Sequence, residues 1–128
     1  MHHLPFIYVR PSRLGGRGVF TAKAIKKDTV VELAPVIVLP AADREVIHRT
    51  QLHDYYFLWD TDGAAIALGY GSLYNHGAPA NLTFSMDYEF HQISFRATRD
   101  IEAGEELLID YREGGGEPLW FAVADSDA

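Results

Sequence analysis

The 128-residue sequence contains no cysteine, which excludes disulfide bonds and zinc sites built on thiolates. Long apolar runs are absent too. The strongest candidate, residues 30–39, is interrupted by Glu32 and Pro35, whereas a membrane-spanning helix needs about 20 apolar residues. The first residues also lack a basic stretch followed by an apolar one, so no secretory signal is predicted. We therefore expect a protein that does not enter a membrane, and an intracellular location is compatible with the sequence.

Basic residues are scarce in the second part of the chain. Up to His53 there are eight Lys and Arg against four Asp and Glu, and beyond it three against fourteen. Duplex binding requires a basic surface that neutralises phosphates, so the net charge of −7 argues against direct nucleic-acid binding. An acidic surface favours a basic partner such as a lysine-bearing peptide. The alternative explanation of the same charge is solubility.

Length and composition indicate one globular domain. Hydrophobic residues make up 48% and charged residues 23% of the sequence, which is typical of a chain that folds around a single core. We treat residues 1–128 as one domain, with an acidic tail at 122–128 that is expected to be disordered.

Short β-rich segments separated by turn residues predict a mainly β fold. Asp60-Thr61-Asp62-Gly63 is a strong turn signal between two of these segments. One modest helix is expected at 41–52, after Pro40, and Pro35 predicts a break or an edge within 29–39. The expected strands lie at 6–10, 19–22, 29–39, 55–59, 64–68, 82–86, 91–97 and 106–111.

Three short motifs stand out, and each is weak by itself. They are GRGVF at 16–20, YNH at 74–76 with an asparagine at position 81, and GEELLIDY at 104–111. Glycines allow a ligand to approach the backbone closely, an asparagine amide offers both donors and acceptors, and the last motif ends in a tyrosine. Their order along one chain is uncommon.

In this order the motifs resemble the SET domain, the catalytic module of protein-lysine methyltransferases that use S-adenosylmethionine. The resemblance covers about residues 6–121, which we take as the core of the domain. It implies a fold of the β-clip-like SET type, with several small curved sheets, one short helix and a C-terminal segment threaded beneath a loop. It also implies methyl transfer to the ε-amine of a lysine in a basic protein, such as a histone or another chromatin component.

The resemblance also implies which residues act. Tyr111 takes the catalytic role by orienting the amine of the substrate lysine. Asn75 contacts the methionyl part of the cofactor, the backbone at His76 contacts the adenine, and Trp120 stacks on the adenine or simply covers the core. The implied cofactor-binding set is Arg17, Gly18, Val19, Tyr74, Asn75, His76, Tyr111 and Trp120.

Further aromatic and apolar residues are candidates for the channel that admits the lysine. Either Tyr56, which we favour, or Tyr55 lies where the family places a channel tyrosine. Phe84 and Ile109 occupy two places that influence how many methyl groups are added, and because neither carries a hydroxyl we expect di- or trimethylation. The sequence departs from the family at 77–78, where Gly-Ala replaces the usual Ser-Cys, and the proline follows at 79.

Two other interpretations remain open. The domain could bind basic, lysine-containing peptides without catalysis, or it could form a homodimer whose partner completes the substrate groove. No metal site is expected, because the spacing of His48, His53, His76 and His91 fits no ligand pattern. In a microbial host we expect a cytoplasmic location, and in a eukaryotic or viral setting a nuclear or chromatin-associated one.

Overall fold

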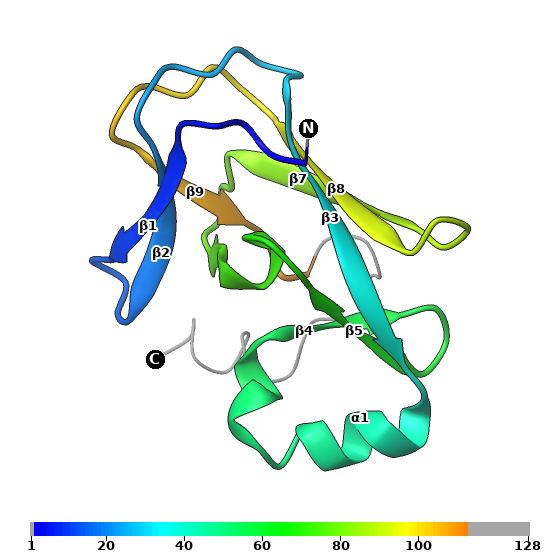
Figure 1. Cartoon of the computed structure of the whole chain (residues 1–128). Helices are drawn as coiled ribbons and strands as arrows, with labels where there is room; N and C mark the ends of the chain where they lie inside the picture. The colour runs from blue at the N-terminus through cyan, green and yellow to red at the C-terminus, as the bar shows by residue number, and fades with distance from the viewer. Residues whose placement is uncertain (1, 113–128) are drawn as a thin grey trace.

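Two curved, mainly antiparallel sheets form the body of the protein in the computed structural model, which describes residues 2–112 (Figure 1). In spatial order, the first sheet contains β1 (Ile7–Pro11), β2 (Arg17–Thr21), β9 (Glu106–Ile109) and β6 (Asn75–His76). The second contains β4 (Tyr56–Trp59), β5 (Gly63–Ala67), β3 (Val30–Leu39), β8 (Gln92–Ala97) and β7 (Leu82–Asp87). The β6–β9 pair is parallel, unlike the other named pairs. The predicted mainly β fold is confirmed.

Pro35 does not break β3, but it marks the point where this strand changes partner. Residues 30–35 pair with β8, and residues 36–39 pair with β5. Proline has no N–H to give to a ladder, so the exchange of neighbours suits this position. The Pro35 carbonyl accepts a hydrogen bond from Leu68 N at 2.9 Å. One long strand can therefore belong to both halves of the second sheet.

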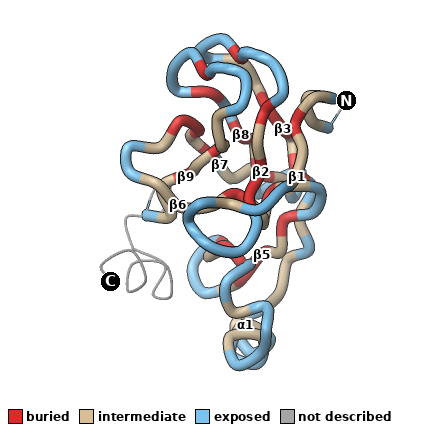
Figure 2. Tube along the Cα trace, turned by 90° about the vertical axis from the view of Figure 1, so that its left-hand side faces the viewer, coloured by how far each residue is buried: buried red, intermediate tan, exposed pale blue. Residues whose placement is uncertain are grey.

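The expected helix at 41–52 is divided in the structure. Helix α1 (Ala41–Ile47) ends early, and a separate 3-10 turn, η1 (Gln51–Asp54), follows it. Thr50 starts the second element, because its hydroxyl accepts a hydrogen bond from Leu52 N at 3.1 Å and so satisfies a free backbone donor. A second 3-10 turn, η2 (Gly71–Leu73), precedes β6. No residue of α1 or η1 is buried, and in Figure 2 the α1 region carries no buried segment.

The core lies where the two sheets curl toward each other. Its aromatic centre joins Tyr74, Phe57, Phe84 and Phe95, with ring centroids 4.7 Å apart for Tyr74–Phe95 and 5.4 Å apart for Phe57–Phe84. All four side chains are at most 5% exposed. Burying such large rings supplies much of the stabilising free energy of a small domain.

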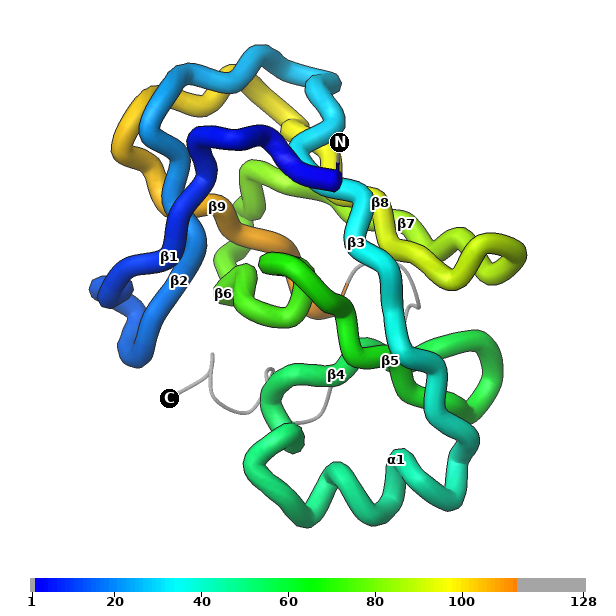
Figure 3. Tube along the Cα trace, in the orientation of Figure 1, coloured from blue at the N-terminus to red at the C-terminus, as the bar shows by residue number. Residues whose placement is uncertain are grey.

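Strand β9 runs between β2 and β6, and the loop that follows β6 is fastened to it (Figure 3). Asn81 is 2% exposed; its Nδ2 donates to Glu106 O at 2.8 Å, and its Oδ1 accepts from Leu108 N at 2.7 Å. Gly77 N donates to Ile109 O at 3.0 Å. These bonds join residues 75–81 to the last strand. Within residues 2–112, no helix has the length and apolar character to cross a bilayer.

Candidate functional site

The first sheet brings the three sequence motifs side by side. In its register, Val19 pairs with Leu107 on one edge of β9, while Asn75 and His76 pair with Leu108 and Ile109 on the other. Residues separated by about 90 positions in the chain thereby become neighbours, because β9 lies between β2 and β6. The convergence follows from strand pairing, which fixes the backbone positions of all three segments.

The Asn75 side chain connects the glycine-rich loop to β9. Its Nδ2 donates to Arg17 O at 3.1 Å and to Glu106 Oε2 at 2.7 Å. The other oxygen of Glu106 accepts from Ser12 Oγ at 2.7 Å. Glu106 and Ser12 were not among the predicted site residues. Glu106 could have been found, since it belongs to the GEELLIDY motif, whereas nothing in the sequence marks Ser12.

Gly18 is required at this junction by close approach. A Cβ atom there would lie 2.8 Å from Asn75 Nδ2 and would overlap the Glu106 carboxylate. Real Cβ contacts do not come so close, so a larger residue would push the asparagine and the glutamate away. Glycine thus allows three polar groups from three strands to meet over one short stretch of backbone.

The acceptors at this junction match the ammonium group of an amino acid. The Glu106 carboxylate, the Arg17 carbonyl and Asn75 Oδ1 can all accept hydrogen bonds, whereas both hydrogens of the Asn75 amide are already donated, to Arg17 O and Glu106 Oε2. The acceptor set therefore fits the ammonium group at the methionyl end of S-adenosylmethionine. Val19 is fully buried, so it could reach a ligand only through its backbone. Trp120 lies outside the described residues.

Tyr111 is held at two points just after β9. Its hydroxyl donates to Tyr74 O at 2.9 Å, and its backbone N–H donates to His76 Nδ1 at 3.1 Å. Burial raises the pKa of Tyr111 to about 12, and the negative charge of Asp54 contributes. The phenol is therefore protonated at neutral pH. Its oxygen can accept hydrogen bonds, but the residue cannot serve as a strong base.

A buried carboxylate supports the segment that holds the Tyr111 hydroxyl. Glu32 is 1% exposed; it accepts from Tyr74 Oη at 2.6 Å and from Tyr70 N at 2.9 Å. Burial raises the pKa of Glu32, and these two hydrogen bonds oppose the rise. Burial also raises the pKa of Tyr74 well above its usual value. The Tyr74 hydroxyl therefore bonds Glu32, whereas the Tyr74 backbone carbonyl accepts the hydrogen bond from the Tyr111 hydroxyl.

His76 is held in its neutral form by its position. Because its Nδ1 accepts from Tyr111 N, the ring proton is on Nε2. Burial lowers the pKa of His76 below 6.5 and Arg112 lowers it further, against the opposing effect of Asp110, whose Oδ1 lies 3.8 Å from Nδ1. The hydrogen bond from Tyr111 N–H to neutral His76 therefore stabilises the fold at neutral pH, and this stabilisation is lost as the pH falls through the lowered pKa of His76.

A narrow pocket lies beside Tyr111. Its volume is about 10 Å³, close to what one water molecule needs. Both candidate channel tyrosines line it: Tyr55 is 38% exposed and Tyr56 is 1% exposed. The residues that line the pocket are Asp54, Tyr55, Tyr56, Phe57, Gly71, Ser72, Tyr74 and Tyr111.

Phe84 and Ile109, predicted to shape the channel, are not among the residues that line this pocket. Both are buried, at 5% and 0% exposure. Phe84 packs against Phe57, which does line the pocket. The influence of Phe84 on methylation state therefore stays a prediction. The Phe84 side chain lies behind Phe57 and does not itself line the pocket.

The Gly-Ala departure at 77–78 has a local physical reason. A Cβ atom on Gly77 would lie 2.6 Å from Leu108 Cδ1. The leucine side chain on β9 thus occupies the space that a serine at position 77 would need. The absence of a side chain at position 77 thus leaves room for Leu108. The loop keeps its backbone hydrogen bond from Gly77 N to Ile109 O.

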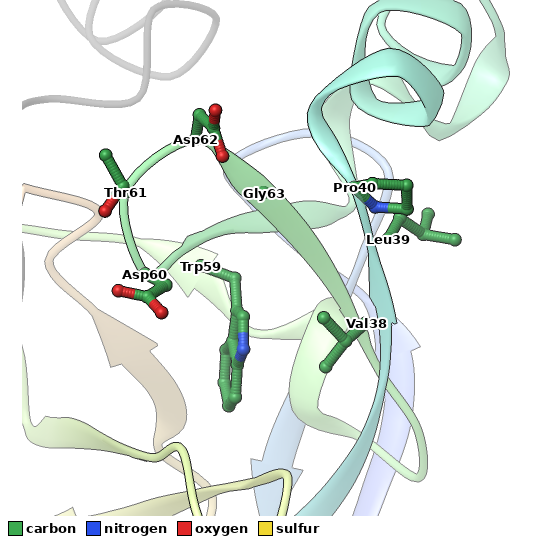
Figure 4. Close-up of a pocket in the computed structure, with 8 residues that line it drawn as sticks. All are labelled: Val38, Leu39, Pro40, Trp59, Asp60, Thr61, Asp62 and Gly63. Atoms are coloured by element: carbon green, nitrogen blue, oxygen red, sulfur yellow. The ribbon is translucent and has the colours of Figure 1, made fainter.

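A larger, open hollow of about 410 Å³ lies at the far end of the β4–β5 hairpin (Figure 4). The turn residues Asp60 to Gly63 border it together with Trp59 and the end of β3. None of the three motifs reaches it. Elsewhere in residues 2–112, no three His, Asp or Glu side chains gather in a way that could hold a metal ion.

Comparison with known proteins gives a consistent result. Residues 16–112 match the family described as the SET domain. The chain is 33% identical over 121 residues, covering 94% of it and 80% of the relative, to the histone-lysine N-methyltransferase of Schizosaccharomyces pombe that is specific for H3 lysine-37.

Two solved structures share the fold. A Plasmodium falciparum protein, described as a candidate histone methyltransferase, has a TM-score of 0.66 and 27% identity over 89% of this chain and 99% of that one. A chain in the apo form of a ctPRC2 complex with two substitutions in Ezh2 has a TM-score of 0.68 and 25% identity, covering 82% of this chain and 15% of that one.

Proposed function

This chain belongs to the SET-domain family of protein-lysine N-methyltransferases, and on that premise we propose that it transfers a methyl group from S-adenosylmethionine to the ε-amine of a lysine in a basic protein. The residues around Asn75 would hold the methionyl end of the cofactor, and the pocket beside Tyr111, which has the volume of about one water molecule, would receive the amine at the end of the lysine side chain. When bound, the cofactor supplies a methyl group on a positively charged sulfur. The chain's own residues position the two reactants and exclude water.

The two half-sites meet along one short stretch of backbone. Asn75 contacts the glycine-rich loop through Arg17 O, and the next residue, His76, holds the backbone of Tyr111. The cofactor side and the lysine side are therefore joined by two consecutive residues of β6. This adjacency is the observation on which the proposal depends, since transfer in line requires donor and acceptor to be held in fixed positions.

Tyr111 and Tyr74 are suited to orient an amine. The Tyr111 hydroxyl donates to the Tyr74 carbonyl, and both oxygens can accept further hydrogen bonds from amine N–H groups. A lysine must be neutral to act as a nucleophile. Entry into a dry pocket lowers its pKa, because burial disfavours the charged form. With the pKa of Tyr111 raised to about 12, alignment and desolvation account for the chemistry without a strong base.

Charge supports a basic substrate. Fourteen acidic residues against three basic ones follow His53, and Asp54 lies at the pocket itself. An acidic surface increases the rate at which a lysine-rich chain associates. Because the Schizosaccharomyces pombe relative acts on histone H3, we take histone H3 as the first substrate to test.

The test is a transfer assay with isotope-labelled S-adenosylmethionine on histone H3, the other core histones and abundant ribosomal proteins, followed by mass spectrometry of the labelled protein. We expect label on lysine. Tyr111→Phe should fold and bind the cofactor as the wild type does but lose about 100-fold or more in turnover, the scale seen when a positioned group at a reaction centre is removed. Tyr88→Phe is the matched control, because Tyr88 is 49% exposed and packs on Trp59.

Calorimetry with S-adenosylmethionine separates the proposal from its alternative. A module that binds basic peptides without catalysis would show no transfer to any protein of the panel and need not bind the cofactor. Full activity of Tyr111→Phe would remove Tyr111 from the mechanism. Equal losses in the Tyr88 control would show that the assay reports on folding and not on the site.

A further inference from the structure

One wall of the Tyr111 pocket is formed by residues that follow α1. Asp54, Tyr55 and Tyr56 line the pocket, yet α1 and η1 bury none of their own residues. Burial of apolar side chains normally fixes the position of a segment. Burial and strand pairing hold Tyr56 in β4, so polar contacts must contribute most to holding the residues of the wall that precede it, Asp54 and Tyr55.

Two histidines and a tyrosine make those contacts, and we call them the histidine clasp: His48, His53 and Tyr56. His48 Nδ1 lies 3.0 Å from Tyr56 Oη, and His53 Nδ1 lies 2.7 Å from the His48 carbonyl. The two imidazole rings are 4.1 Å apart. Since a carbonyl only accepts, His53 carries its proton on Nδ1. The clasp closes residues 48–56 into a loop against the fully buried Tyr56 ring.

We propose that His48 is a positioning residue for the lysine pocket: through Tyr56 and His53 it fixes the wall that presents Asp54 and Tyr55 beside Tyr111. The inference deepens the proposed function by assigning a role at the same site. It also separates the two candidate channel tyrosines. The Tyr56 hydroxyl is engaged with His48 in the clasp, whereas Tyr55 stands at the pocket with 38% of its surface exposed.

The clasp is sensitive to acid because of the charges around it. The groups that face His48 are Arg44 from α1, Arg49 from the connecting turn, His53 from η1 and Tyr56 from β4. Partial burial lowers the pKa of His48 below 6.5, and His53, Arg44 and Arg49 lower it further. At neutral pH, Nδ1 is unprotonated and Tyr56 O–H donates to it.

Protonation at Nδ1 reverses that hydrogen bond and places a cation against His53 and the two arginines. A base whose pKa is lowered by folding stabilises the fold above its usual value and loses that contribution as the pH falls through the lowered pKa. The pocket wall should therefore loosen below about pH 6.5. Substrate lysines would then meet a less ordered wall and an added positive charge.

The kinetic test compares wild type, His48→Ala, His48→Asn and Tyr56→Phe, with histone H3 as substrate between pH 5.5 and 8. His48→Ala and Tyr56→Phe should each lower kcat/KM about fivefold at pH 7.5, the equivalent of one hydrogen bond. The double variant should be no worse than either single one. His2→Ala, an exposed histidine, is the matched control.

His48→Asn gives the decisive contrast. Its side chain can place a hydrogen-bonding atom near the position of Nδ1 but cannot titrate, so activity at pH 7.5 should return to within about twofold of wild type. Deprotonation of the substrate lysine affects all variants alike. The ratio of His48→Asn to wild-type activity should therefore rise as the pH falls below 6.5. A constant ratio, or additive losses in the double variant, would overturn the proposal.

Failure of the proposed function is recognised separately. If the wild type transfers no methyl group, the NMR titration of His48 still tests the clasp. The Tyr56 hydroxyl lies 3.0 Å from His48 Nδ1 and can bond both the neutral and the protonated ring, so its removal in Tyr56→Phe should change the pKa of His48. An unchanged pKa would contradict the clasp whatever the activity. Calorimetry should show that His48→Ala binds S-adenosylmethionine as the wild type does, since the clasp is anchored on β4 of the second sheet and Asn75 lies in the first.

Discussion

The two walls of the Tyr111 pocket are built in different ways. One, which we call the ladder wall, contributes Tyr74 and Tyr111 to the pocket lining. These two residues belong to segments 74–76 and 106–111, which are joined by strand pairing and have the buried side chains of Asn81 and Glu32 behind them. The other, the clasp wall of residues 48–56, is attached through polar contacts of segments that bury none of their own residues up to Asp54. The site thus combines a half fixed by strand pairing, which carries the proposed catalytic tyrosine and the proposed cofactor contacts, with a half held largely by polar contacts.

The largest effect on the free energy of unfolding is expected when Asn81, which lies behind the ladder wall, is replaced by alanine. Asn81→Ala removes two hydrogen bonds to β9 and leaves the Glu106 carbonyl and the Leu108 N–H without a partner. An unsatisfied buried polar group costs about 1–3 kcal/mol, so the free energy of unfolding should fall by about 2–4 kcal/mol. Urea denaturation measures this.

Ser85→Ala is the control for that experiment. Its hydroxyl bonds Ser94 on an exposed face of β7, and its removal should change stability by less than about 0.5 kcal/mol. If Asn81→Ala cost no more than this control, strand pairing alone would hold the ladder wall and the buried amide would be dispensable.

A smaller, pH-dependent effect is expected behind the ladder wall at Glu32. Folding raises the pKa of this carboxyl above 4.5, so the native state binds a proton more tightly than the unfolded state. Between pH 4.5 and the raised pKa, wild-type stability therefore declines as the pH increases. Glu32→Gln cannot titrate; it should cost about 1 kcal/mol at pH 5, and this deficit should shrink toward pH 7. Thermal unfolding at several pH values measures the difference, and a deficit that grows toward pH 7 would contradict the assigned direction.

The smallest global effect is expected in the clasp wall. Thr50→Ala removes the hydroxyl that accepts from Leu52 N at the start of η1, which should cost about 1 kcal/mol or less. Because η1 buries no residue, we expect faster hydrogen exchange at residues 51–55 with little change in the core strands. Uniformly faster exchange across both sheets would show that the two walls are not independent.

Much of the fold could be predicted from the sequence, since alternating apolar residues and turn signals located the strands well. Pro35 was misleading only in part: it interrupts pairing with one neighbour, and the strand continues with another. The helix at 41–52 was predicted too long because local propensity does not show that Thr50 starts a separate turn. Strand order, which brings 16–20 beside 104–111, came from resemblance and not from local pattern.

The structure brings Asn75, His76 and Tyr111 together, and their functional roles stay predictions. Three residues that support them, Glu106, Ser12 and Glu32, were not foreseen from the sequence. From the sequence, Glu32 is only a charged residue that interrupts an apolar run, and its buried partners become visible only in the structure. Likewise, His48 and His53 carry no metal-ligand spacing, so their contact with Tyr56 could come only from three-dimensional structure.

The most direct test of the account is NMR mapping of backbone amides during titration with S-adenosylmethionine. Binding is predicted to shift resonances in three separate stretches of sequence, 16–19, 75–77 and 106–111, while those of the hollow at 59–63 stay in place. Shifts confined to the hollow, or to one of the three stretches, would contradict the claim that the first sheet assembles a single cofactor site beside Tyr111.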